Sequence, residues 1–124
     1  MGRGKVLRDD GSVSVEFVLV IPLVILVLLG ALEVIGVAKS RIELEAAARE
    51  GARVAATTPD PARAVEAVRG VLGDEAAAKA RITVERPTVV GALARVVVLT
   101  EHRLSIPGGL VVPVSAEAVM RVER

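Results

Sequence analysis

The residues with the most informative spacing lie near the N-terminus, where a glycine and a glutamate precede a long apolar run. Four residues separate Gly11 from Glu16, and Phe17 follows Glu16 directly. Between residues 17 and 38 the only charged side chain is Glu33. The chemistry that this spacing offers is electrostatic, because a carboxylate in the first turn of a helix interacts favourably with the positive end of the helix dipole. A generic membrane anchor does not require such spacing.

The rest of the chain offers no arrangement that is typical of catalysis. His102 is the only histidine, and its surroundings favour a solvated strand position. Ser105 and Ser115 lack a G-x-S-x-G setting. Gly108-Gly109 lacks the Lys-Ser/Thr of a phosphate-binding loop and predicts a turn. The absence of cysteine excludes thiolate nucleophiles and thiolate metal sites. We therefore predict that the chain is not an enzyme and has no cofactor, metal or small-molecule substrate.

The composition of the chain argues against nucleic-acid binding. The chain has 124 residues, a length that suggests one domain, and its formal net charge is +1. Phe17 is the only aromatic residue. Aromatic stacking platforms for single-stranded nucleic acid are therefore absent, and the near-neutral charge offers no basic field for DNA. We expect no nucleic-acid partner.

The apolar run predicts one membrane-spanning helix. At about 1.5 Å per residue, residues 17–38 cover roughly 30 Å, the thickness of a bilayer's hydrocarbon core. We expect the helix to begin near Ser12 to Ser14, because either serine can cap it. Basic residues both precede and follow the run, so charge alone leaves its orientation open.

Two residues inside the run depart from a plain apolar helix. Pro22 leaves the carbonyl of Val18 without its helical donor, which predicts a local kink. Glu33 falls in the outer half of the span, where a carboxylate costs less than the ~2.5–3.5 kcal/mol expected at the bilayer centre. It would either reach the headgroups or pair with a cation on a neighbouring subunit.

Beyond the run the pattern stays helical until about residue 57 and becomes amphipathic and rich in alanine. Arg41, Glu45 and Arg49 have alternating charges at four-residue spacing, which stabilises an exposed helix face. Glu43 and Glu50 belong to the same charged segment. These residues predict a solvated surface and not an acidic binding site.

Residues after 58 predict a second helix and a sheet. Asp60 as N-cap and Pro61 at the first helical position start a helix that ends near Leu72. Val96-Val97-Val98-Leu99 is apolar on both faces, which predicts a central strand. The expected fold class is α+β. A long N-terminal helix, half transmembrane and half amphipathic, is followed by a short helix and a small three-stranded antiparallel sheet, with strands over 81–86, 94–105 and 112–123.

Three stretches resemble one known family. Gly11, then four residues, then Glu16-Phe17 and an apolar helix resemble the class III signal of type IV pilin-like proteins. The segment 45–56, with Arg49, Gly51 and Arg53, resembles the segment after the membrane helix in the TadE-like family, and so does the closing run 116–123. TadE-like proteins are minor pilins or pseudopilins of the Tad/Flp pilus machinery. The folded part after the long helix favours this class over a major pilin.

The resemblance implies how the chain is divided and processed. Residues 1–11 would be a cytoplasmic leader, 12–38 a transmembrane pilin core helix, and 39–124 an extracytoplasmic helix with a small α+β domain. A prepilin peptidase would cut between Gly11 and Ser12.

Assembly is the second implication of the resemblance. Glu16, followed by Phe17, would neutralise the new amine of Ser12 on a neighbouring subunit, and Pro22 would mark where the helix loosens in a filament. The implied partners are the peptidase, other pilins or pseudopilins, and membrane lipid. The implied location is the inner membrane, single-pass with the N-terminus inside, or the pilus itself.

Two other interpretations stay open. In the first, the protein is a single-pass membrane protein that is never cut, and the spacing of Gly11 and Glu16 is coincidental. In the second, a secretory signal is removed after Ala38, because Gly36-Val37-Ala38 has the small-x-small pattern of a cleavage site. The length of the apolar run and the presence of Glu33 argue against the second.

Overall fold

The computed structural model describes the backbone of residues 6–124 and the side chains of residues 11–124. The chain divides into two compact units, with the boundary between Ile35 and Gly36. The first helix, α1 (Val6–Thr57), crosses this boundary.

The described residues of the N-terminal unit all belong to the first part of α1. This helix begins at Val6, so the expected start near Ser12 to Ser14 was wrong, and neither serine is its N-cap. A serine cap stabilises a helix by only about 1 kcal/mol, and the single glycine at position 11 costs a similar amount. Neither effect is large enough to end a helix whose preceding residues contain no proline. Residues 1–5 of the expected leader lie outside the described residues.

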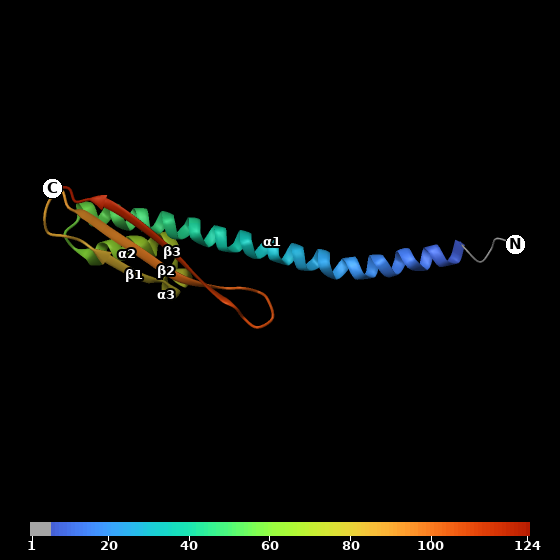
Figure 1. The fold of residues 1–124 in the computed structure, drawn as a ribbon. Helices are drawn as coiled ribbons and strands as arrows, with labels where there is room; N and C mark the ends of the chain where they lie inside the picture. Colours follow the sequence, from blue (N-terminus) through green and yellow to red (C-terminus); the bar gives the residue numbers. More distant parts are fainter. Residues whose placement is uncertain (1–5) are drawn as a thin grey trace. The chain divides into compact units, whose positions relative to one another are not determined.

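The C-terminal unit contains the end of α1 and all the remaining elements that the structure describes (Figure 1). Two short helices are followed by three antiparallel strands in the order β1-β2-β3. The expected α+β class is confirmed, as are the second helix and the central position of the second strand. The elements are α2 (Pro61–Leu72), α3 (Asp74–Lys79), β1 (Arg81–Glu85), β2 (Leu93–Arg103) and β3 (Val111–Arg121).

The start of α2 follows the sequence signal. The side chain of Asp60 accepts a hydrogen bond of 3.0 Å from the backbone N–H of Ala62, and Pro61 occupies the first helical position. Val68 is fully buried on the inner face of α2, as is Ala64 one turn before it. Val68 and Ala64 join α2 to the core.

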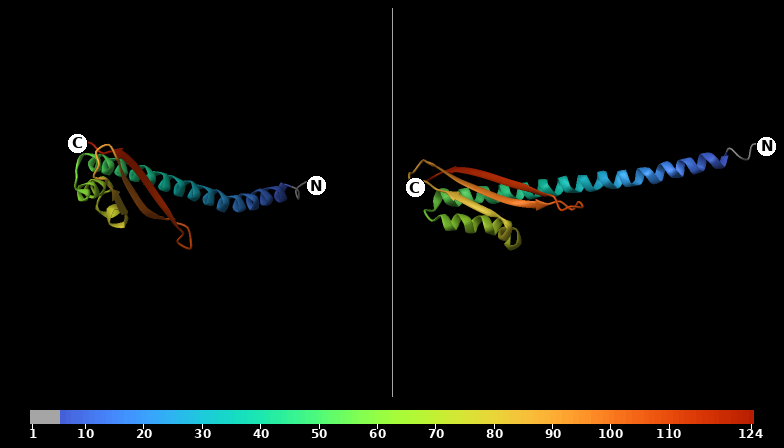
Figure 2. Two further views of the ribbon diagram at one scale, coloured as in Figure 1. Left: turned by 60° about the vertical axis from the view of Figure 1, so that its left-hand side comes forward. Right: turned by 60° about the horizontal axis from the view of Figure 1, so that its bottom comes forward.

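The core of this unit lies between the helices and one face of the sheet, and Figure 2 shows the strands running alongside the end of α1. β2 contributes Val96 and Val98, which are both fully buried. Leu99 points to the other face and is 36% exposed, so β2 is central but not covered on both faces. The remaining core residues are mostly small, and they come from α1, α2, the sheet and the position directly after β3: Leu44, Ala47, Ala48, Ala52, Ala55, Ala64, Val68, Ala94, Val114, Ala116 and Val122.

Candidate functional site

The motif at the N-terminal end lies entirely within α1. Gly11, Ser12, Glu16 and Phe17 are all helical and exposed. Ser12 and Glu16 are four residues apart and therefore lie on the same side of the helix, about 6 Å apart along its axis. The uncut chain has no amine at Ser12, so the charge pair implied by the resemblance does not exist in this form of the protein.

Gly11 is a glycine that the fold does not require. A Cβ added there would meet no described atom within 4 Å apart from its own helix, and its backbone is helical. Glycine within a helix costs about 1 kcal/mol relative to alanine. Gly30, also in α1, has equally open surroundings. Packing against the described residues therefore explains neither glycine.

The helix that follows the motif is apolar on all sides. Large side chains from Val13 to Ile35 are exposed around its whole circumference. From Gly11 on, α1 is long and apolar enough to cross a membrane. A helix that is hydrophobic all round requires an apolar surrounding, either lipid or other helices. The N-terminal unit thus has the composition and length of a membrane anchor.

Pro22 and Glu33 both fall inside this helix. The helix continues through Pro22, and the local kink expected there stays a prediction. Glu33 is half-buried and engaged in an interaction within this chain. Its proposed pairing with a neighbouring subunit also stays a prediction, and such pairing would have to replace or extend an existing contact.

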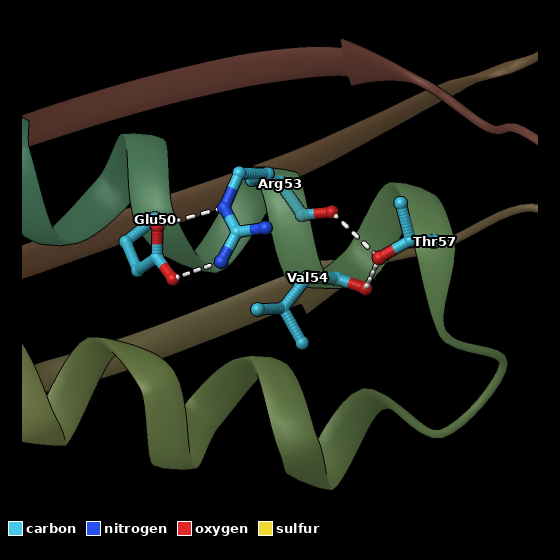
Figure 3. Close-up of polar contacts among 4 residues, drawn as sticks. All are labelled: Glu50, Arg53, Val54 and Thr57. Carbon is cyan, nitrogen blue, oxygen red and sulfur yellow. Dashed lines mark hydrogen bonds and ion pairs between the residues drawn. The ribbon is translucent and has the colours of Figure 1, made fainter.

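The second half of α1 carries the charged face that the sequence predicted. Glu45 pairs with Arg41 at 3.4 Å and with Arg49 at 3.3 Å. A further pair, between Glu50 and Arg53, was not anticipated, although its three-residue spacing was visible in the sequence. Arg53 donates two hydrogen bonds, one of 2.9 Å to Oε2 and one of 2.6 Å to Oε1 of Glu50 (Figure 3). This arrangement lowers the pKa of the Glu50 carboxyl, chiefly through the hydrogen bond from Arg53.

The three residues of the segment after the membrane helix separate onto two faces. Arg49 and Arg53 lie on the solvated face, whereas Gly51 is buried against α2 and the sheet. A Cβ on Gly51 would lie 2.5 Å from Cγ2 of Val68 and 3.2 Å from Cγ1 of Val96. Gly51 is therefore needed for the close approach of α1 to α2, and it is a packing residue.

Comparison with known proteins points to the same part of the chain. A family model described as TadE-like protein matches residues 11–53. This match includes the motif around Gly11 and Glu16, the apolar helix, and the segment up to Arg53. The resemblance seen in the sequence is thereby confirmed over these residues, whereas the closing run 116–123 lies outside the match. No curated protein and no solved structure matches the chain.

Proposed function

From the TadE-like segment that residues 11–53 form, we propose that this chain is a minor pilin or pseudopilin of a Tad-type pilus or a related secretion machine. A prepilin peptidase removes the leader after Gly11, and the apolar helix then holds the subunit in the inner membrane or in the filament. The C-terminal unit lies on the extracytoplasmic side. Its partners are the peptidase, lipid, and other pilins or pseudopilins.

The observation that carries this proposal is the spacing of Gly11, Glu16 and Phe17 at the start of a helix that is apolar on all sides. A plain membrane anchor explains the helix but gives no reason for an acidic residue five positions after an unpacked glycine. Processing gives both residues a role. The glycine is the small residue at the cut, and the carboxylate is the partner for the new amine.

The charge of Glu16 is the basis of assembly in this mechanism. Cleavage gives Ser12 a free amine with a reference pKa near 8, which is protonated at neutral pH. In a bundle of such helices, each subunit buries one charged amine and one carboxylate. Burying either charge alone costs several kcal/mol, so Glu16 of one subunit meets the Ser12 amine of another and sets the axial register.

The intact mass and N-terminal residue of the membrane-extracted protein test the processing step. We expect a mature chain that begins at Ser12 and has equal numbers of acidic and basic side chains. Retention of Met1 would contradict processing and support a permanent anchor, whereas an N-terminus at Lys39 would support the secreted alternative.

A matched pair of variants makes this test specific to the cut. Gly11→Leu should block cleavage, because the residue before the cut has to be small. Gly30→Leu serves as the control, since Gly30 is also unpacked within α1, and this variant should be processed normally. Equal processing of both variants would show that Gly11 does not define the cut.

A further inference from the structure

The loop that joins β2 to β3 exposes a group of apolar side chains. Ile106 is 40% exposed, Leu110 is 59% exposed, and Val111 at the start of β3 is 40% exposed. No charged residue occurs between Leu104 and Ala116. A single exposed apolar residue is ordinary on a protein surface, but a cluster in an uncharged loop is typical of a contact surface.

The shape of this loop is defined by hydrogen bonds. The backbone N–H of Leu104 donates to the carbonyl of Leu110 at 2.8 Å, which closes the base of the loop. At the tip, the N–H of Gly109 donates to the carbonyl of Ile106 at 3.2 Å. Gly108 has φ of 104°, a conformation that favours glycine. The turn therefore holds Ile106 and Leu110 at the end of the hairpin.

The hairpin runs beside the last part of α1, and its loop lies at the Gly36 end. At the opposite end, the N–H of Glu123 donates to the carbonyl of Ala56 at 2.9 Å. The ring of His102 lies against Gly36, 3.4 Å from the place of a Cβ there. At the Ala56 end, Val122 donates a backbone hydrogen bond to the carbonyl of Ala92 at 2.8 Å. The lengths agree, because the segment from Ala92 to His102 covers roughly 33 Å and the helix from Gly36 to Ala56 roughly 30 Å. Figures 1 and 2 show this loop at the end of the unit opposite the C-terminus.

Gly36 is also where the apolar run approaches its end at residue 38. With residues 17–38 in the bilayer, Gly36 lies at the boundary of the hydrocarbon core. The loop follows His102 and lies at the Gly36 end of the C-terminal unit, so its apolar residues are close to that boundary.

We propose that the loop 104–111 docks on the lipid surface, with Ile106 and Leu110 between the headgroups and the acyl chains. Apolar side chains bind at this depth when basic groups next to them contact anionic headgroups. The proposal rests on one part of the proposed function, the anchoring of α1 in a membrane, and it depends on neither cleavage nor pilus assembly.

The charges beside the loop fit an anionic lipid surface. Lys79, Arg81, Arg103 and Val111 line one concavity of about 880 Å³ at this end of the sheet, together with Glu101. Lys79 also pairs with Glu75 at 3.9 Å, so the positive charge in excess of Glu101 comes from Arg81 and Arg103. Among the side chains that the structure describes, neither Arg81 nor Arg103 takes part in a salt bridge. Their long stems allow the charged ends to reach phosphate groups while the loop lies deeper.

The test places single fluorescent labels on the full-length protein in lipid vesicles. The chain has no cysteine, so Leu110→Cys gives one labelled site at the loop. Val89→Cys is the matched control, because Val89 is 65% exposed in the loop at the opposite end of the sheet. Leu26→Cys, in the apolar run, reports insertion of the anchor. Brominated phospholipid is the quencher from the lipid side, and iodide is the quencher from water.

We expect brominated lipid to quench the labels at positions 26 and 110 and to leave the label at 89 open to iodide. Charge reversal with Arg81→Glu and Arg103→Glu should reduce the lipid quenching at position 110 in anionic vesicles, with little change in zwitterionic ones. If the label at 110 behaves like that at 89 while the label at 26 is quenched, the loop lies in water. That result would overturn the proposal and leave the membrane anchor intact.

Two further outcomes would also overturn the proposal. A label at 110 that neither quencher reaches would mean that protein, such as a second copy of the chain, covers the loop. A label at 26 that brominated lipid does not quench would mean that α1 is not inserted, and the proposed membrane function would then fail together with the lipid docking.

Discussion

Arg86, which directly follows β1, donates a hydrogen bond of 2.7 Å from Nε to the carbonyl oxygen of Ala55 near the end of α1. Ala55 is one of the last residues of the helix, whose carbonyls have no partner within the helix. The neighbouring carbonyl of Ala56 accepts from the N–H of Glu123. Residues that follow β1 and β3 therefore cap α1, through a cation and a backbone donor from distant parts of the chain.

Removing the guanidinium should destabilise the C-terminal unit. For Arg86→Met we expect a loss of about 1.5–3 kcal/mol, because the hydrogen bond is charge-assisted and the cation also stabilises the negative end of the helix dipole. Urea unfolding of the detergent-solubilised protein, followed by circular dichroism, measures the change. Arg63→Met is the control at an exposed helical position, and it should stay within about 0.5 kcal/mol of the wild type. Equal effects of the two variants would show that the cap contributes no stability.

Replacing two glycines of the C-terminal unit with alanine should change the stability of the unit in opposite directions. Gly51→Ala should destabilise by about 1–3 kcal/mol, because the new methyl group overlaps Val68. Gly70→Ala should stabilise by up to about 1 kcal/mol, because Gly70 lies in α2 with nothing within 4 Å among the described atoms. Thermal unfolding of both variants gives the comparison. A stabilising Gly51→Ala would contradict the close packing of α1 on α2.

The pair of Glu50 and Arg53 predicts a dependence of stability on pH. The folded state holds the pKa of Glu50 below its ordinary value, and the main cause is the hydrogen bond from Arg53. A depressed carboxyl pKa stabilises the folded state above the unfolded pKa of ~4.3, and this contribution is lost as the pH falls through the lower folded value. NMR titration should show the carboxyl of Glu50 titrating at lower pH in the wild type than in Arg53→Gln. Coincident titration curves would contradict the interaction.

Loss of the Glu16 carboxylate should separate processing from assembly. In Glu16→Ala, cleavage after Gly11 should continue. Each assembled subunit would, however, bury an unpaired amine at a cost of about 3–5 kcal/mol, which corresponds to an association constant lowered more than 100-fold. Glu16→Asp should be milder. Mass spectrometry reports the cut, and co-purification with partner pilins reports the association.

The control for this experiment is Glu43→Ala, which removes a carboxylate from α1 beyond the apolar run. Glu43 makes a surface pair with Lys39 at 3.9 Å, and such pairs contribute little. This variant should assemble normally. A processed Glu16→Ala protein that associates like Glu43→Ala would show that Glu16 does not neutralise the amine.

The sequence alone determined the features that depend on neighbours along the chain. The length and polarity of the apolar run, the cap of Asp60 on α2 and the pairing of Glu45 with Arg41 and Arg49 all follow from residue type and short spacing. The antiparallel order of the three strands also follows, because short connections favour adjacent pairing. Local physics was sufficient for each of these features.

Only the tertiary structure decided the features that join distant residues. No periodicity places Arg86 at the carbonyl of Ala55, identifies Gly51 as the contact with Val68, or brings His102 of β2 against Gly36. The start of α1 at Val6 was also missed, since the effects of a serine cap and a helical glycine are both near 1 kcal/mol and local signals of that size do not determine a boundary. Each of these features depends on which surfaces meet after folding, and that information is not contained in local sequence patterns.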